Sequence, residues 1–130
     1  MKLLLDTHTF MWFIDGSKKL HDYARNLIED ESNERLLSIA SLWEMSIKSS
    51  LGKLSVTISF LDLVETQVKP NDIVLLPIVP AHLDTLRTLP FHHRDPFDRL
   101  LIAQSMVEGG VVLSRDAAFD PYPIRRIWSG

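Results

Sequence analysis

Residues 95–114, DPFDRLLIAQSMVEGGVVLS, decide the fold class of this chain. The stretch opens with Asp-Pro, which are the residue types preferred at the cap and the first position of a helix. The helical pattern over 95–108 ends at the glycine pair 109–110, and the apolar run 111–114 predicts a buried strand. A helix that leads directly into a buried strand is half of an α/β repeat.

The same alternation continues through the rest of the chain. Short apolar runs predict strands at 2–5, 36–39, 74–78 and 111–114, with a last short strand in the tail at 124–128. Apolar residues at three- and four-residue spacing predict helices at 7–14, 20–31, 41–51, 59–69, 81–89 and 95–108. We therefore expect one α/β domain over residues 1–130, with three α/β/α layers and a mostly parallel sheet of four to five short strands.

Composition narrows the classes of protein that fit. The 130 residues are 45% hydrophobic, which suits a single core, and the absence of cysteine excludes disulfides and thiolate metal sites. The apolar run at the N-terminus is far shorter than a signal-peptide core, and no stretch approaches the ~20 apolar residues that span a bilayer. We expect a cytoplasmic protein with no membrane partner. The net charge of −3 argues against a surface-wide phosphate-binding field, so nucleic acid would require local basic groups.

Four acidic residues fall where predicted strands end or predicted helices begin. Asp6 ends the first strand, and Glu44 and Asp98 occupy first turns of the helices at 41–51 and 95–108. Asp116 follows the fourth strand. Because the carboxyl ends of parallel strands and the N-termini of the connecting helices meet at one edge, we expect the four side chains to share a cleft.

Converging carboxylates predict a hard metal ion. They repel one another unless a cation compensates, and oxygen-only ligation suits Mg²⁺ or Mn²⁺. The pattern therefore predicts metal-dependent phosphodiester hydrolysis through one or two ions, with no nucleophilic side chain.

Each acid also has a purely structural interpretation. Asp6 could cap the helix that follows it, and Glu44 could complete a Ser-Leu-Trp-Glu capping box or pair with Lys48. Asp116 could begin a turn, and Asp120 is close enough to take its place as the fourth acid. For Asp98 the cap position is already filled by the preceding Asp-Pro, which leaves its side chain for the cleft.

Taken together, these segments resemble the PIN-domain family, and within it the VapC-type toxins. The motifs that carry the resemblance are LLLDTH at 3–8, SLWEMSIK at 41–48, DPFDRLLIA at 95–103 and LSRDAAF at 113–119. The resemblance implies a PIN-like fold and metal roles for Asp6, Glu44 and Asp98, with Asp116 in the variable fourth position. It further implies cleavage of RNA with Mg²⁺ or Mn²⁺, the toxin role in a type II toxin–antitoxin pair, an inhibitory antitoxin protein and a homodimer.

Residues next to the acids extend this hypothesis. Thr7 and Ser114 would support the acidic cluster, or would satisfy loop backbone near the strand ends. The candidates for contacts with RNA phosphates are His8, Lys48, Arg99 and Arg115. Lys48 and Arg99 could equally pair with the acids.

For other conspicuous residues we favour structural interpretations. The segment 92–94, His-His-Arg, is more typical of a solvated loop than of a rim around the site or a zinc site. Four large apolar residues are expected in the core rather than in an antitoxin groove: Trp12, Phe13, Trp43 and Met45.

Two other classes of α/β protein are excluded because an aspartate that each requires is absent. A phosphotransferase of the haloacid dehalogenase type needs a second Asp two residues after Asp6, where His8 stands. A response-regulator receiver needs a phosphoacceptor Asp at the end of the third strand, and 74–78 contains none. The remaining alternative is a catalytically silent PIN-like module that binds RNA or a partner protein, and the intact set of acids counts against it.

Overall fold

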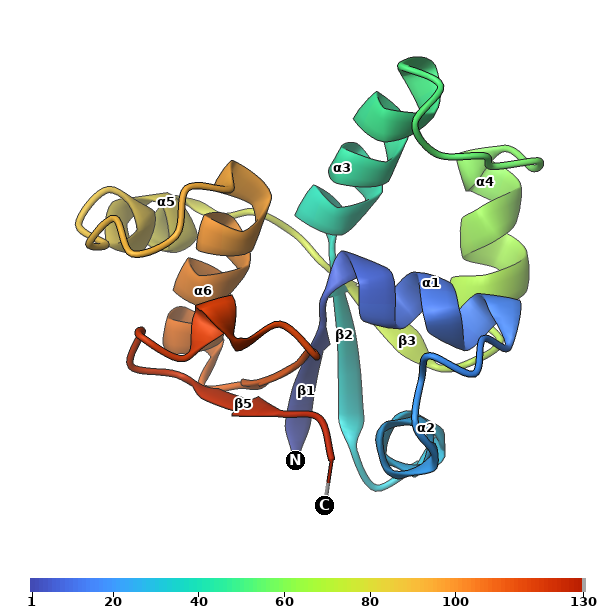
Figure 1. Cartoon of the computed structure of the whole chain (residues 1–130), viewed down its shortest axis with the longest axis horizontal. Coiled ribbons are helices and arrows are strands. Elements are labelled where there is room, and N and C mark those ends of the chain that lie inside the picture. Colours follow the sequence, from blue (N-terminus) through green and yellow to red (C-terminus); the bar gives the residue numbers. More distant parts are fainter. Residues whose placement is uncertain (130) are drawn as a thin grey trace.

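A parallel sheet of five strands forms the centre of the molecule (Figure 1). The computed structural model describes residues 1–129. The strands are β1 (Lys2–Leu5), β2 (Glu34–Ser38), β3 (Ile73–Leu76), β4 (Val111–Leu113) and β5 (Arg125–Ile127). Their order across the sheet is β3-β2-β1-β4-β5, and each neighbouring pair is parallel. The expected parallel sheet is confirmed, including the strand in the tail.

Helices cover both faces of this sheet. They are α1 (Thr7–Asp15), α2 (Asp22–Glu29), α3 (Ile39–Ser50), α4 (Phe60–Leu63), α5 (Pro80–Leu86) and α6 (Pro96–Glu108). A π-helical turn, Val64–Val68, extends α4, and a short 3₁₀ helix spans Ala117–Phe119. In Figure 1, α1, α2 and α4 lie on one side of the strands and α5 and α6 on the other. The three-layer α/β/α arrangement is therefore confirmed.

Successive side chains of the central strands enter opposite cores. One core, beneath α1, α2 and α4, contains the paired residues Leu5, Leu37 and Leu113. The other, beneath α6, contains the paired residues Leu4, Leu36 and Val112. Strands buried on both faces are continuous apolar runs, which is why these segments show no polar alternation.

Helix α3 begins earlier than the sequence indicated. Ser38 is both the last residue of β2 and the N-cap of α3, since its Oγ accepts a hydrogen bond of 3.0 Å from the Ala40 amide. The chain passes from strand to helix without a loop, so the expected capping box that ends at Glu44 is wrong. Glu44 consequently lies in the second turn of α3 rather than the first.

Candidate metal centre

Asp6 joins the end of β1 to the start of α1 and to the end of β4. Its Oδ1 caps α1 by accepting a hydrogen bond of 2.8 Å from the Thr9 amide. Its Oδ2 accepts a hydrogen bond of 2.5 Å from Ser114 Oγ, just beyond β4. The capping interpretation is thus confirmed for this residue, and its second oxygen links the carboxylate to the segment that follows β4.

Ser114 links Asp6 to the fourth acid. Besides donating to Asp6, Ser114 Oγ accepts a hydrogen bond of 3.0 Å from the Asp116 amide. Asp116 caps the 3₁₀ helix through Oδ1, which accepts from the Ala118 amide at 2.9 Å. A single buried hydroxyl therefore sets the relative positions of two acidic residues from the same edge of the sheet.

Glu44 reaches this edge from the second turn of α3. Its side chain is buried, with 5% of the residue exposed. Thr7 Oγ1 donates to Oε1 at 2.6 Å, and Lys48 Nζ lies 2.7 Å from Oε2. This hydrogen bond from Lys48 to Glu44 raises the pKa of the lysine. Lys48 thus forms the ion pair that was one of its two interpretations, and both Glu44 oxygens are already engaged.

Asp98 lies in the first turn of α6, where Asp95 occupies the cap. Asp95 Oδ1 accepts from the amides of Phe97 at 2.8 Å and Asp98 at 3.0 Å, so the cap forms as expected. Burial, followed by the nearby charges of Asp95, Asp6 and Glu44, raises the pKa of Asp98 to about 7, against a smaller opposing effect of His93. Negative charge is therefore under-compensated around this carboxylate.

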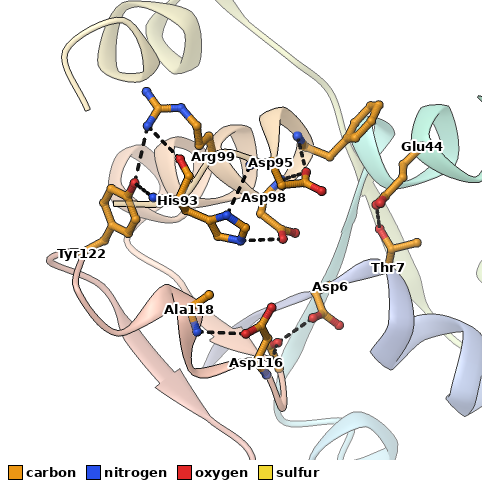
Figure 2. A network of polar contacts seen from close by, with 12 residues as sticks. Asp6, Thr7, Glu44, His93, Asp95, Asp98, Arg99, Asp116, Ala118 and Tyr122 are labelled. Atoms are coloured by element: carbon orange, nitrogen blue, oxygen red, sulfur yellow. Dashed lines mark hydrogen bonds and ion pairs between the residues drawn. The ribbon is translucent and has the colours of Figure 1, made fainter. Parts of the chain in front are cut away.

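These side chains converge on one space. Figure 2 shows the carboxylates of Asp6, Asp98 and Asp116 directed toward one another, with Glu44 beside them across Thr7. Ligand atoms of His93, Asp98 and Asp116 lie within 4.8 Å of one another. Asp120 points elsewhere, because both of its carboxylate oxygens bond Arg126, at 2.7 and 3.0 Å. Asp116, and not Asp120, is therefore the fourth acid at this edge.

Comparison with known proteins identifies the fold. A family model described as the PIN domain matches residues 3–124, which is nearly the whole chain. The chain belongs to the PIN-domain family. No curated protein sequence matches it.

Solved structures share this PIN fold at low sequence identity. The VapBC2 complex from Rickettsia felis, bound to a promoter DNA fragment, contains a chain with a TM-score of 0.71 at 12% identity, over 98% of both chains. FitAB bound to the IR36 DNA fragment gives 0.65 at 15% identity, over 96% of this chain and 93% of that one. VapBC-1 from nontypeable Haemophilus influenzae gives 0.63 at 11% identity, over 98% and 97%.

The basic residues expected near the acids separate into two groups in this PIN domain. His8 and Arg115 are exposed and line a cleft of about 400 Å³ together with Asp6, Trp12 and Asp116. The Arg115 guanidinium lies 4.7 Å from the centre of the Trp12 ring. An aromatic and basic wall therefore borders the acidic space.

Arg99 is not part of that wall. Only 6% of the residue is exposed, and its guanidinium donates to the carbonyl oxygens of Pro90 at 2.9 Å and Leu89 at 3.2 Å. It also lies 3.9 Å from the centre of the Phe91 ring. Arg99 therefore holds the loop before α6, a role that differs from both the expected RNA contact and the expected pairing with an acid.

His93 is the site residue that the sequence interpretation missed. The segment 92–94 was expected to be a solvated loop, and His92 and Arg94 are indeed exposed. The His93 side chain is only 15% exposed, and its Nε2 lies 2.9 Å from Asp98 Oδ2. The available signal was position, since a loop that enters the N-terminus of a helix lies at the same sheet edge as the acids.

Of the four large apolar residues expected in the core, three contact it and one does not. Met45 is buried, and Trp12 and Phe13 pack partly buried against the same core. Trp43 is 54% exposed on α3, where its ring meets the edge of Phe97 at 5.1 Å between centres, so the expectation of a core position is wrong for this residue. Within residues 1–129, no helix has the length and apolar character needed to cross a membrane.

Proposed function

We propose that this chain is a Mg²⁺- or Mn²⁺-dependent endoribonuclease that hydrolyses RNA phosphodiester bonds and acts as the toxin of a type II toxin–antitoxin pair. The observation that carries the proposal is that the carboxylates of Asp6, Asp98 and Asp116, from three separate segments, face one space at the carboxyl edge of the sheet (Figure 2). Ligand atoms of Asp98 and Asp116 lie within 4.8 Å of each other and of one on His93. Membership of the PIN-domain family supports it.

The donor set fits a hard divalent cation. The three aspartates offer only oxygen ligands, which suit such an ion. Burial, followed by the charges of nearby acids that include Asp6, raises the pKa of Asp98 to about 7. Asp6, Asp98 and Asp116 would hold the ion, with Glu44 as a further acid beside it. A bound ion would supply an activated water and would stabilise the charge that develops on the phosphate.

The chain's own residues preset this geometry. Ser114 fixes Asp6 Oδ2 relative to Asp116, and Thr7 with Lys48 fixes both oxygens of Glu44. Side chains that are already oriented lose little conformational freedom when the ion and substrate bind. Lys48 remains partly exposed beside its ion pair with Glu44, which supports it as a further candidate for an RNA phosphate contact.

His8 and Arg115 are the proposed contacts with RNA phosphates. Both are exposed in the cleft that Asp6 and Asp116 also line, so a phosphate held at the aspartates would place the neighbouring nucleotides against them. Removing Arg115 should raise the KM for RNA and weaken the dependence of binding on salt, with kcat less affected.

The test of the nuclease is cleavage of RNA by purified protein with Mg²⁺, with Mn²⁺ and with excess EDTA. Asp6→Asn and Asp98→Asn should abolish cleavage while leaving the circular dichroism spectrum unchanged. Asparagine can still cap α1 at residue 6, and Asp98 is not the cap of α6. Asp120→Asn is the matched control, because Asp120 bonds Arg126 outside the acidic space. Cleavage that survives EDTA or both site variants would contradict the mechanism, and RNA binding without cleavage would favour a silent PIN-like module.

An antitoxin partner and a homodimer complete the proposal. Two of the compared structures are named as VapBC complexes, which supports a partner protein for this chain as well. A hollow between α1, α3 and α4 has a mixed lining, with Met11, Met45 and Leu63 among its apolar residues and Asp15 and Gln67 among its polar ones, and it offers a further surface for a partner. Co-expression with a candidate small partner should suppress RNA cleavage and give a stable complex on size exclusion, and light scattering should give the mass of a dimer for the free chain. We also propose that the protein acts in the cytoplasm.

A further inference from the structure

His93 is held rigidly in the loop that leads into α6. Its backbone N–H donates to Tyr122 Oη at 2.9 Å, and its ring meets the Phe119 ring at 6.1 Å with an interplanar angle of 70°. Arg99 Nη1 lies 3.5 Å from the His93 carbonyl oxygen as a long hydrogen bond. Contacts from both α6 and the segment around the 3₁₀ helix therefore set the direction in which the imidazole points.

The two ring nitrogens of His93 have different partners. Nδ1 accepts a hydrogen bond of 3.3 Å from the backbone N–H of Asp95. An amide N–H can only donate, so Nδ1 must keep its lone pair and the proton of the neutral ring must be on Nε2. That proton faces Asp98, whose Oδ2 lies 2.9 Å from Nε2 (Figure 2).

Nε2 of His93 is buried, and Asp98 is the polar group that faces it. The nitrogen is closed off from solvent and has no hydrogen-bond partner among the described residues. Asp98 Oδ2 lies 2.9 Å away, but the two groups are not oriented as a hydrogen bond, and the hydrogen bonds of such sites often form fully only when the ligand binds. The pair is close enough to form this bond once the Asp98 carboxylate turns toward the N–H.

We propose that His93 is a positioning residue for Asp98: its Nε2–H holds Oδ2 of that carboxylate, so that the other oxygen is presented to the divalent ion. Direct ligation of the ion by Nε2 is the competing arrangement, because ligand atoms of His93, Asp98 and Asp116 share one 4.8 Å cluster. Ligation would need the proton on Nδ1, where it would collide with the Asp95 amide hydrogen. The inference rests on the proposed metal-dependent function. It adds to that function a hydrogen-bond donor, His93 Nε2–H, that orients one of the carboxylate ligands.

The position of the ring proton can be measured directly. Long-range ¹H–¹⁵N correlation spectra of ¹⁵N-histidine-labelled protein at pH 8, with and without Mg²⁺, resolve the tautomer of each of the five histidines. The His93 signals are assigned from their absence in His93→Gln. We expect the proton on Nε2 in both spectra. A shift of the proton to Nδ1 on adding Mg²⁺ would establish ligation instead, and a tautomer mixture like that of a free ring would show that His93 is not engaged with Asp98. Either result would overturn the proposal.

Metal affinity tests the consequence for the site. Binding of Mn²⁺ to the wild-type protein and its variants is followed from the electron paramagnetic resonance of the free ion, without substrate. His93→Phe keeps a ring against Phe119 but removes the N–H, and it should weaken Mn²⁺ binding by roughly 10- to 100-fold. His93→Gln retains an N–H donor and should recover much of the affinity. A merely structural histidine would show no such recovery at equal thermal stability.

The neighbouring histidine is the matched control. His92 is exposed and contacts only the Tyr122 ring in this network, at 5.3 Å between centres, so His92→Phe should leave Mn²⁺ affinity unchanged. Unchanged affinity in His93→Phe would overturn the positioning role even if the wild-type protein cleaves RNA. If His93→Phe weakens Mn²⁺ binding but the wild-type protein never cleaves RNA, the positioning role of His93 is supported and the proposed nuclease function is overturned. If His93→Phe fails to fold, the tautomer spectra of the wild-type protein still decide the question.

Discussion

Single side chains at this site have a structural role besides the chemical role proposed for them. Asp6 caps α1 with one oxygen and faces the acidic space with the other, and Asp116 caps the 3₁₀ helix while lying within the cluster. Capping places a carboxylate at a helix N-terminus, where the partial positive charge of the helix favours it. The local chemistry that starts these elements therefore also delivers the acids to the site.

Asp98 should make the metal-free protein less stable as pH rises. Its folded-state pKa is raised from 3.8 to about 7, so between these values the folded chain keeps a proton that the unfolded chain has lost. The free energy of unfolding therefore falls across this range and levels off above it. In Asp98→Asn this fall should be absent, and at pH 8 without metal the variant should be more stable than the wild type by on the order of 2 kcal/mol, allowing for partial solvent screening.

Urea titrations at pH 5 and pH 8 in EDTA measure this effect. The difference between variant and wild type should be larger at pH 8 than at pH 5. Asp120→Asn provides the opposite control, because the hydrogen bond from Arg126 lowers the pKa of Asp120 and its replacement should not stabilise the protein at pH 8. Equal stability of Asp98→Asn and wild type at pH 8 would show that Asp98 bears no uncompensated charge.

The sequence predicts the acids, and the hydroxyls of Thr7 and Ser114 that bond them, far better than it predicts His93 and Arg99. Asp6 and Asp116 can be found because each follows a strand, and Asp98 because it lies in the first turn of a helix, and these positions meet at one edge of any parallel α/β sheet. Glu44 lies in the second turn of α3, not in the first turn that its sequence pattern predicts. His93 and Arg99 cannot be assigned in this way. His93 lies in a loop and Arg99 in the first turn of α6. The direction in which each side chain points depends on contacts with Tyr122 and with the carbonyls of residues 89–90, and no local sequence pattern encodes these contacts.

At the scale of the elements, Arg99 anchors the loop between α5 and α6. Its guanidinium satisfies buried carbonyls at Leu89 and Pro90, so Arg99→Lys should lose bidentate geometry and destabilise the fold by about 2–3 kcal/mol. Chemical denaturation measures this loss, and exposed Arg94→Lys is the matched control. If Arg99→Lys has normal stability but binds RNA more weakly, the anchoring role is wrong and Arg99 contacts RNA, as one interpretation of the sequence predicted.

The turn between α6 and β4 depends on two glycines for different reasons. Gly109 ends α6 with φ of 68°, and a Cβ there meets no atom within 4 Å. A Cβ on Gly110 would lie 2.2 Å from Leu4 Cδ1, which is fixed in the core. We therefore expect Gly109→Ala to cost about 1 kcal/mol through backbone strain and Gly110→Ala about 1–3 kcal/mol through overpacking.

Thermal melts of the two glycine variants distinguish these causes. Leu4→Val opens space at the clash and should partly rescue Gly110→Ala without rescuing Gly109→Ala. Failure of that rescue would show that contact with Leu4 Cδ1 is not what excludes a side chain at Gly110, whose φ lies outside the left-handed region.

Element boundaries are the part of the fold that the sequence predicts least well. The start of α3 was placed at Ser41 because Ser-Leu-Trp-Glu has the form of a capping box, yet the cap is Ser38. Both serines are plausible caps locally. The choice is made by the sheet, since β2 pairs with β3 as far as Ser38 and the helix must begin there to follow the strand without a loop. Local signals cannot contain that constraint.

Across the whole molecule, strand order explains why the site lies between β1 and β4. The chain builds β1, β2 and β3 outward in one direction and then crosses to add β4 and β5 on the other side of β1. Loops after β1 and β4 therefore diverge to opposite faces and leave a crevice at the carboxyl edge, where ligands bind in open α/β sheets. Asp6 follows β1, and Ser114 and Asp116 follow β4. The topology itself places these residues around the crevice.

Because the acids come from elements spread over the chain, a bound ion should stabilise the whole domain. An ion that binds only the folded state at a hundred times its Kd adds about 2.7 kcal/mol to the free energy of unfolding, which is roughly 10 °C in Tm for a domain of this size. We expect Mg²⁺ and Mn²⁺ to raise the Tm of the wild-type protein progressively with concentration, and EDTA to reverse the rise. Asp120→Asn should respond as the wild type does, whereas Asp98→Asn should start from a higher metal-free Tm at pH 8 and gain much less. A wild-type Tm that is unchanged by millimolar Mg²⁺ and Mn²⁺, or an equal gain in Asp98→Asn, would mean that the convergent carboxylates do not form a metal site.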